Sequence, residues 1–545
     1  MPLPRRHVPS WHMLSRHTLS RRGLLGGLTG VGAATVLLGT GAHAVEAPAA
    51  MRLSGYPFTL GVASGDPLPN SVVLWTRLAP EPLAPDGHGG MPRRPVAVTW
   101  QLAHDDRFQR LAASGTATAT PELGHSVHAE VWGLQPGREY YYRFIVGDDV
   151  SETGRTKTAP DYLGTPGQVS LAFASCASWN DGFFTAYQHL ADEDLDVVLH
   201  LGDYIYEQGI HQDGPRPEEV PATMREETVT LARYRQQYGL YKSDGHLKAA
   251  HAAAPWIVTL DDHEVDNDWA GDHAADPAED ATFVGRRAAA FQAYYEHMPL
   301  RATATPHGPD MRLYRRLRYG ELIDLSVLDT RQYRDVQAGG HEPEPPNEDS
   351  ADPSRSMLGL DQEKWLLANF AQSRARWQVL AQQAPMARTN VDDSGGLAVF
   401  MDPWDGYDAT RRRVLDGAHD RGANDLVVLT GDRHRHHASD LKANYDDPDA
   451  PTLASELICS SITSGGDGGD TDEYVRAALA ANPHMHFANA RRGYVRCVVT
   501  PDYWLTDFRV VPAVTEPDAP VRTRASFVVE HGRPGVQADS AGPPV

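Results

Sequence analysis

Six short apolar runs alternate with amphipathic or irregular stretches between residues 168 and 430, and they constrain the fold more than any other feature of the sequence. The runs span residues 169–174, 195–201, 256–260, 322–328, 377–380 and 425–430. Near-continuous apolar runs of this length predict strands that are covered on both faces. Residues 183–192, between the first two runs, have helical spacing. The sequence therefore predicts an α/β layered domain.

Polar clusters follow four of these runs directly, at residues 174–178, 202–207, 261–268 and 431–437. Any one of them alone could be a turn or a solvated loop. Ligands in α/β sheets bind beyond the carboxyl ends of the strands, so we expect the four clusters to meet. Carboxylates that are crowded together raise one another's pKa and destabilise the fold unless cations neutralise them. The sequence therefore predicts a site for several metal ions.

An all-β domain is predicted ahead of the α/β part. Short β segments such as 72–76, 96–100 and 140–146 are separated by Gly and Pro turns. Residues 134–137, which precede a run of tyrosines, resemble the corner of a fibronectin-like sandwich. Regular turn spacing without helical periodicity favours a β-sandwich. The predicted organisation is a β-sandwich domain at residues 54–160, an α/β domain at 165–530 and a flexible C-terminal tail at 531–545.

The first 44 residues have the order of an export signal. They contain five arginines and no acid, and an apolar stretch follows Arg21-Arg22 and ends at Ala42-His43-Ala44. A charged segment, an apolar segment and a small-x-small cleavage site are the parts of a signal peptide. The paired arginines favour a twin-arginine signal at residues 1–44, with an ordinary secretory signal or a retained anchor as alternatives. We therefore expect export by the twin-arginine machinery and a secreted, periplasmic or cell-wall-associated protein.

Charge and cysteine content exclude several classes of protein. The formal net charge of −22 argues against nucleic acids or anionic membranes as main partners. No uninterrupted apolar run of about 18 residues follows the N-terminal segment, so we expect no transmembrane segment in the mature form. The three cysteines are an odd and sparse set that does not fit a disulfide framework. Cys459 and Cys497 lie in apolar β contexts and are expected to be buried free thiols.

Several motifs resemble those of one known family. They are FASC, GDYIYE, LDDHEVDND, LDTRQYR, LTGDRHRHHASDL and, near the start, FTLGVASGDPLPNSVVLWTRL. These motifs resemble the PhoD-like alkaline phosphatases, which belong to the calcineurin-like metallophosphoesterases and are related to purple acid phosphatases. The resemblance runs from about Phe58 to about Thr500. It implies an α/β fold with a four-layer β-sandwich core flanked by helices, preceded by a small all-β fibronectin-like domain.

The resemblance also assigns metal ligands. Asp203 matches the carboxylate that bridges two metals in the family, and Tyr206 matches a phenolate ligand of iron(III). Cys176 would supply a thiolate where many relatives have Asp. His434 would complete the iron site, and Asp432 would face the second metal. A hard trivalent ion lowers the pKa of a phenol enough for it to bind as phenolate.

Four further residues are implied around the substrate. Asp262 occupies the position of an Asn metal ligand, and the neighbouring His263 would stabilise the transition state or protonate the leaving oxygen. Asn267 would contact phosphate or metal. Arg331 would hold phosphate oxygens by paired hydrogen bonds, with a structural salt bridge as the alternative.

Two departures from the family pattern bear on the metals. Gln382 and Gln383 follow the fifth run, where relatives outside this branch have a metal-binding His. This favours a second metal that prefers oxygen ligands, calcium over zinc. Asp268 stands where some relatives have Asn. The expected cofactors are therefore iron(III) and calcium, with other divalent metals as alternatives.

The function implied is hydrolysis of phosphate esters by a metal-activated hydroxide, with small monoesters and diesters as substrates and an alkaline optimum. One alternative is a calcium-dependent phospholipase D-type diesterase acting on phospholipids. Another is an exported, non-catalytic protein that binds metal or phosphate. His263 argues against the latter, because a pure binding protein needs no proton donor beside its metal ligands.

Overall fold

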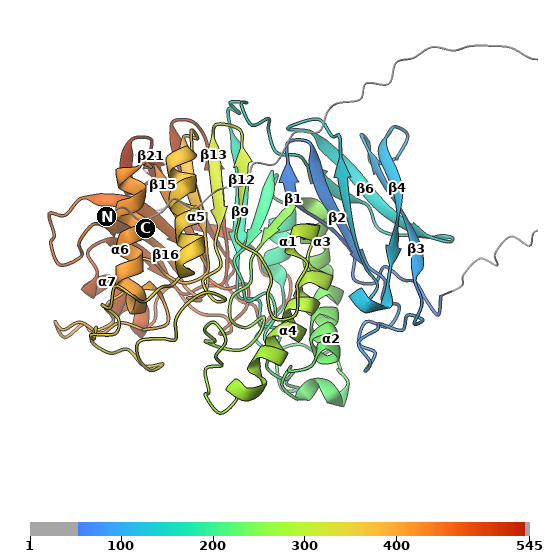
Figure 1. Cartoon of the computed structure of the whole chain (residues 1–545), viewed down its shortest axis with the longest axis horizontal. Helices are drawn as coiled ribbons and strands as arrows, with labels where there is room; N and C mark the ends of the chain where they lie inside the picture. The colour runs from blue at the N-terminus through green and yellow to red at the C-terminus, as the bar shows by residue number, and fades with distance from the viewer. Residues whose placement is uncertain (1–52, 424, 540–545) are drawn as a thin grey trace, which may run out of the picture. The chain divides into compact units, whose positions relative to one another are not determined.

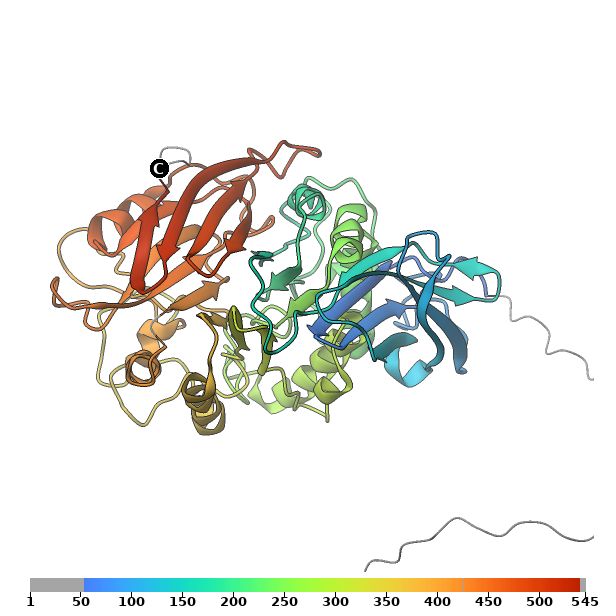
Figure 2. The same cartoon turned by 90° about the horizontal axis from the view of Figure 1, so that it is seen from above.

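The computed structural model describes residues 53–423 and 425–539. Its largest sheet is a mixed β-sheet of ten strands (Figure 1). In spatial order its strands are β22 (Arg533–Ala538), β21 (Arg522–Glu530), β20 (Tyr503–Val510), β19 (Gly493–Val499), β9 (Val169–Ala174), β10 (Val197–His200), β11 (Trp256–Val258), β1 (Val62–Leu68), β2 (Ser71–Arg77) and β5 (Ser126–Trp132). Strands β9, β10, β11 and β1 are parallel, and the flanking strands are antiparallel. Figure 2 shows the C-terminal strands, in red, at the opposite end from the N-terminal strands, in blue.

A second sheet of seven strands contains the last three of the six predicted apolar runs. Its order is β12 (Arg315–Tyr319), β13 (Ile323–Val327), β14 (Trp377–Ala381), β15 (Leu426–Thr430), β17 (Thr452–Ile458), β16 (His436–Lys442) and β18 (Met485–Asn489). Strands β13, β14, β15 and β17 are parallel to one another. The six predicted strands are therefore all present, but the first three and the last three belong to different sheets.

The two sheets share a buried apolar core and each packs helices on its other face. Phe173 of β9 and Leu325 of β13 belong to the core between the sheets, whereas Ala172 and Ala174 of β9 join the core under the helices. Successive side chains of a strand point to opposite faces of the sheet, which explains why neighbouring residues of β9 join different cores. Helices α1 (Thr185–Ala191), α2 (Leu231–Ser243), α3 (Gly245–Ala253) and α4 (Asp280–His297) cover the first sheet, and α5 (Gly359–Gln372) and α6 (Asp408–Asp420) cover the second.

The remaining elements lie at the margins of these layers. Helix α7 (Glu473–Ala481) packs on β18. Four short 3₁₀ helices occupy connections, at Pro121–Leu123, Ala222–Arg225, Ala302–Ala304 and Trp404–Tyr407. No helix among the described residues is long and apolar enough to cross a membrane. The twin-arginine signal predicted at residues 1–44 lies outside the described residues.

The N-terminal sandwich shares a sheet with the α/β part of the chain. Its outer sheet is β4 (Leu111–Ala119), β3 (Val96–Ala103), β6 (Glu139–Val146) and β7 (Asp149–Val150), with β8 (Gly154–Lys157) paired to β6. Its inner sheet is the β1-β2-β5 end of the ten-stranded sheet, where Gly65 pairs with Trp256 of β11. Val72, Leu74 and Tyr142 lie in the core between these layers. The boundary predicted between residues 160 and 165 thus separates segments that one continuous sheet joins.

The flexible tail predicted at residues 531–545 is wrong for residues 533–538. These residues form β22, which pairs with β21, and the backbone N of Val536 donates a hydrogen bond to Asp440 (2.9 Å). His531 also donates to Asp425 (2.5 Å). The Gly and Pro content of this segment misled the prediction, because an edge strand tolerates both residues where its N–H groups are not needed.

Candidate metal centre

The predicted site residues meet where β9, β10, β11 and β15 end, so the convergence expected from the sequence is observed. Five non-glycine residues around this point have left-handed backbone conformations: Cys176, Asp203, Asp268, Asp432 and His434, with φ between 53° and 63°. Such conformations are unfavourable for residues with a Cβ and gather at functional sites. Four of these residues, Cys176, Asp203, Asp432 and His434, lie in the loops directly after β9, β10 and β15 and belong to groups of possible metal ligands.

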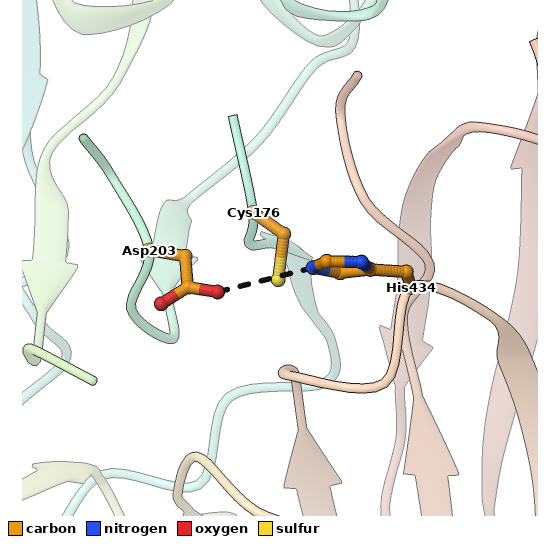
Figure 3. A group of neighbouring side chains, drawn as sticks. All are labelled: Cys176, Asp203 and His434. Carbon is orange, nitrogen blue, oxygen red and sulfur yellow. Dashed lines mark ion pairs between the residues drawn. The ribbon is translucent and has the colours of Figure 1, made fainter. Parts of the chain in front are cut away.

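One group of possible metal ligands consists of Cys176, Asp203 and His434, whose donor atoms all lie within 4.8 Å of one another. Figure 3 shows their side chains pointing toward one another from three separate loops. His434 Nε2 lies 3.9 Å from Asp203 Oδ2. The phenolic oxygen of Tyr206 lies 3.2 Å from Asp203 Oδ2 and 3.0 Å from His434 Nε2. All four predicted iron ligands are therefore within reach of one point.

Two further groups of possible ligands adjoin the first. Asp203, Asp262 and His263 form the second, and Asp261, Asp262 and Asp432 form the third. Because Asp203 belongs to the first and second groups and Asp262 to the second and third, the three are contiguous. The place of Asp203 in two groups matches the bridging role expected for it. Asp261 was not assigned a role from the sequence, although it begins the acidic run after β11.

The donor set fits metal ions. Oδ1 of Asp203 and Oδ2 of Asp261 are buried and accept no hydrogen bond from the described residues. Burial raises the pKa of the Cys176 thiol and of the Tyr206 phenol well above their usual values, and the charge of Asp203 adds to this in both. These groups can become anionic ligands only beside a compensating cation. Thiolate, phenolate, imidazole and carboxylate together suit a transition metal, and the carboxylate group suits an oxygen-preferring ion.

Glu264 holds the loops after β10 and β11 together, a role that was not predicted from the sequence. Its buried carboxylate accepts hydrogen bonds from the backbone N–H groups of Asp203 (3.1 Å), Tyr204 (2.5 Å) and Asp261 (2.7 Å). Burial raises the pKa of Glu264 to about 7, although these hydrogen bonds oppose the rise. Glu264 thus fixes the backbone at two ligand positions without facing the centre.

His263 belongs to the second group and is held in place by Glu207. Its Nδ1 donates a hydrogen bond to Oε2 of Glu207 (2.7 Å), and its ring packs on the Tyr206 ring with centroids 4.1 Å apart. Burial lowers the pKa of His263, but the carboxylates of Glu207, Asp262 and Asp203 outweigh it and keep this pKa well above its usual value. Of these three carboxylates, that of Glu207 belongs to no ligand group, and its hydrogen bond favours the protonated imidazole. Glu207 was not assigned this role from the sequence.

The sequence matches models of one protein family over most of its length. Residues 171–508 match the model described as PhoD-like phosphatase, and residues 44–160 match the N-terminal domain of the same family. The chain belongs to the PhoD-like phosphatase family. The resemblance expected from the motifs is thereby confirmed.

Two relatives of this PhoD-like phosphatase support the assignment along the whole chain. Alkaline phosphatase D of Bacillus subtilis (strain 168) is 49% identical over 498 residues, which cover 91% of this chain and 85% of that protein. A solved structure of PhoD is 48% identical, with a TM-score of 0.86, and the match covers 90% of this chain and 94% of that one. The fold and the order of elements described above are therefore those of the family.

Arg331 of the PhoD-like phosphatase is not placed to hold a phosphate group. Its side chain is wholly buried, Nε donates to Asp261 Oδ1 (2.5 Å), and Nη1 donates to Asp402 Oδ1 (3.0 Å). Nη2 lies 3.7 Å from both Asp262 and Asp432. The predicted catalytic contact of Arg331 with substrate is wrong, because four carboxylates enclose the guanidinium, and the alternative of a structural salt bridge is observed.

Asn267 lies at the exposed rim, away from the three ligand groups. Its backbone N–H donates a hydrogen bond to Oε1 of Glu207 (3.3 Å). The other oxygen of this carboxylate, Oε2, accepts the hydrogen bond from His263. The contact of Asn267 with phosphate or metal stays a prediction. Asp268 lies closer, since its backbone N–H donates to Asp262 Oδ2 (2.8 Å).

Gln382 and Gln383, after β14, are fully buried and serve the fold. Gln383 Nε2 donates to Thr259 Oγ1 (2.7 Å), and Gln382 Nε2 donates to Thr430 Oγ1 (2.7 Å). Cys459 and Cys497 are buried free thiols, as predicted.

Proposed function

We propose that this chain is a metal-dependent phosphoric ester hydrolase of the calcineurin-like metallophosphoesterase superfamily, with an alkaline phosphatase or phosphodiesterase activity. One observation carries the proposal: three contiguous groups of possible metal ligands meet at the strand ends, and His263 in one of them is hydrogen-bonded to Glu207. Membership of the PhoD-like phosphatase family and the similarity to a protein named alkaline phosphatase D support the same activity.

The ligand groups suggest how the metals are divided. Iron(III) would be held by Cys176, Asp203, Tyr206 and His434, the group that contains both sulfur and phenol. Calcium or another oxygen-preferring ion would be held on the side of Asp262 and Asp432, together with Asp261. When bound, such ions activate water and neutralise negative charge on phosphoryl oxygens.

The residues of the chain supply positioning and a proton. His263, held by Glu207, would donate a proton to the oxygen of the leaving alcohol as its bond to phosphorus breaks. Glu264 keeps the backbone of Asp203 in its left-handed conformation, so the bridging carboxylate needs little reorganisation. Phosphoryl transfer needs little covalent protein chemistry, so preorganisation of this kind is the expected contribution of the protein.

Export through the twin-arginine route forms part of the proposal. The paired arginines at Arg21-Arg22 and the apolar segment after them support it. Fusing residues 1–50 to a reporter that is active only outside the cytoplasm tests it. We expect export to need a functional twin-arginine translocase and to fail when both arginines are replaced by lysine.

The activity is tested with p-nitrophenyl phosphate, bis-p-nitrophenyl phosphate and phosphatidylcholine. We expect the purified enzyme to hydrolyse one or both nitrophenyl esters, to lose this activity on chelation and to regain it with added metal. Asp203→Asn should abolish turnover and reduce bound metal. Asp194→Asn is the matched control, because that carboxylate is 98% exposed. Full activity in Asp203→Asn would refute the proposal, and selective cleavage of phosphatidylcholine would replace it with a phospholipase D-type activity.

A further inference from the structure

A cavity of about 330 Å³ opens directly beside the metal centre. Asp432 lines it and also belongs to the third ligand group, so the cavity and the centre are continuous. Asp268, which is bonded through its backbone N–H to Asp262, forms part of the same wall. The volume is at the lower end of the range for small-molecule sites, enough for a compact group beside a bound phosphate.

The acids in the wall of this cavity are already balanced by neighbouring cations or imidazoles. Asp268 Oδ2 bonds to His341 Nδ1 (2.8 Å), and Asp280 Oδ2 bonds to His273 Nδ1 (3.0 Å). Asp402 is paired with Arg331 and Arg334, and Asp432 lies 3.7 Å from Arg331. None of these carboxylates needs a further cation from the cavity wall.

Arg433 is the one arginine in the wall of this cavity, and the groups that it hydrogen-bonds and stacks on are neutral. Its guanidinium carbon lies 4.0 Å from the centroid of the Phe400 ring and 4.9 Å from that of Tyr474, and its Nε donates to the Tyr474 hydroxyl (3.0 Å). Burial lowers the pKa of Arg433, but Tyr474, Asp432 and Asp402 outweigh this effect, and no carboxylate of residues 53–423 or 425–539 lies within ion-pair distance of the guanidinium. The two rings fix the plane of the guanidinium, and its terminal N–H groups are left to bind a ligand. A guanidinium held in this way suits a carboxylate or phosphate, which it can bind through two parallel hydrogen bonds.

We infer that this cavity receives the leaving group of the substrate and that Arg433 selects phosphate esters whose leaving alcohol carries a second anionic group. The inference rests on the proposed hydrolysis, in which water adds to phosphorus, the bond from phosphorus to the leaving oxygen breaks, and that oxygen gains a proton. Phosphate and an anionic alcohol are then the two products. The second anion, a carboxylate or a further phosphate, pairs with Arg433 while the reacting phosphate occupies the metal centre.

Three substrates that differ only in the leaving group test this inference: phenyl phosphate, para-carboxyphenyl phosphate and hydroquinone bisphosphate. The measured quantity is the ratio of kcat/KM for each charged ester to kcat/KM for phenyl phosphate. In Arg433→Gln we expect both ratios to fall roughly tenfold, because a charge-assisted hydrogen bond is lost. Arg433→Lys should keep part of the preference, since it retains the charge without the paired donors. A fall for only one ester would identify that anion as the one selected.

The control is Arg412→Gln, on α6. Arg412 pairs with Asp408 (2.7 Å) and does not line the cavity, so its loss should leave both ratios unchanged. Arg433→Met is measured beside Arg433→Gln, on protein with wild-type metal content, so that a single poorly folded variant does not decide the outcome. Unchanged ratios in the Arg433 variants would overturn the inference and leave the hydrolase intact. A wild-type enzyme that hydrolyses bis-p-nitrophenyl phosphate but none of the three monoesters would also overturn the inference, whereas one that hydrolyses neither the diester nor any monoester would refute the proposed function.

Discussion

The phenolic oxygen of Tyr206 donates a hydrogen bond to Oδ2 of Asp203, 3.2 Å away, although only two residues separate them in the chain. The left-handed conformation of Asp203 (φ 53°) turns the loop after β10 so that both side chains face the same point. Ser464, from a distant loop, donates a hydrogen bond to the same phenolic oxygen (2.6 Å). Two anionic ligands can thus be supplied by one short motif, provided that a cation compensates their charge.

Replacing Glu264 by Gln should destabilise the loops that carry Asp203 and Asp261. Gln keeps one oxygen acceptor and introduces an N–H group toward backbone donors, so we expect a loss of about 1–3 kcal/mol in the free energy of unfolding. Metal content should fall with it, since Glu264 holds Asp203 and Asp261. Denaturant unfolding and elemental analysis measure the two effects. Glu530→Gln, on an exposed strand end, is the control, and equal behaviour of the two variants would contradict the role of Glu264.

His263→Gln should slow esters with poor leaving groups more than esters with good ones. A proton donor matters most when the departing oxygen is strongly basic, and general acid catalysis typically contributes about 10²–10⁴-fold. We therefore expect a far larger loss of kcat for an alkyl phosphate than for p-nitrophenyl phosphate. Glu207→Gln should show the same pattern more weakly, because it removes the partner of His263 Nδ1. Equal losses for both esters would show that His263 does not protonate the leaving group.

Arg331→Gln should destabilise the fold strongly. Removing the guanidinium leaves Asp261 buried without its ion-pair partner and Asp402 paired with Arg334 alone, and breaking a buried ion pair in this way costs about 3–5 kcal/mol. Arg412→Gln is the control, because that side chain is largely exposed and pairs with Asp408. Thermal and denaturant unfolding of metal-loaded protein make the comparison. A stable Arg331 variant with only a raised KM would restore the phosphate contact predicted from the sequence.

His200 should make the protein less stable in acid. Burial, with the nearby charge of Lys242, lowers the pKa of His200 to about 3, whereas an unfolded chain has a histidine pKa of about 6.5. The unfolded state therefore binds more protons between these values, and the free energy of unfolding falls as the pH falls, by up to about 1.4 kcal/mol per pH unit. In His200→Gln, whose amide can still accept the hydrogen bond from Tyr187, this slope should decrease. His307→Gln, at an exposed position, should keep the wild-type slope, and an unchanged slope in His200→Gln would contradict the assignment.

The local features of the site could be predicted because each depends on only a few consecutive residues. The apolar run 169–174 followed by Cys176 indicates a buried strand with a ligand beyond its end. The same pattern, an apolar run followed by a polar residue, predicts the positions of Asp203 and Asp432. The partition of the six strands between two sheets could not be read in this way, because β9 and β13 have the same apolar character and only tertiary packing separates them.

The errors have a common cause: the partners of a residue are set by distant segments. Arg331 follows a strand in a way that suits a phosphate contact, and only its enclosure by Asp261 and Asp402 shows otherwise. The composition of residues 533–538 suggests a flexible tail, but pairing with β21 makes them a strand. Glu264 looks like one more acid in an acidic run, and its three backbone hydrogen bonds appear only in the folded chain.

The central claim is that Cys176, Asp203, Tyr206 and His434 share one cation. An optical spectrum and elemental analysis of protein purified without chelators test it most directly. We predict bound iron and a visible absorption band from a phenolate ligand, which Tyr206→Phe removes and which Tyr204→Phe, a change at a neighbouring buried tyrosine, leaves in place. A colourless, iron-free and fully active enzyme would contradict the claim.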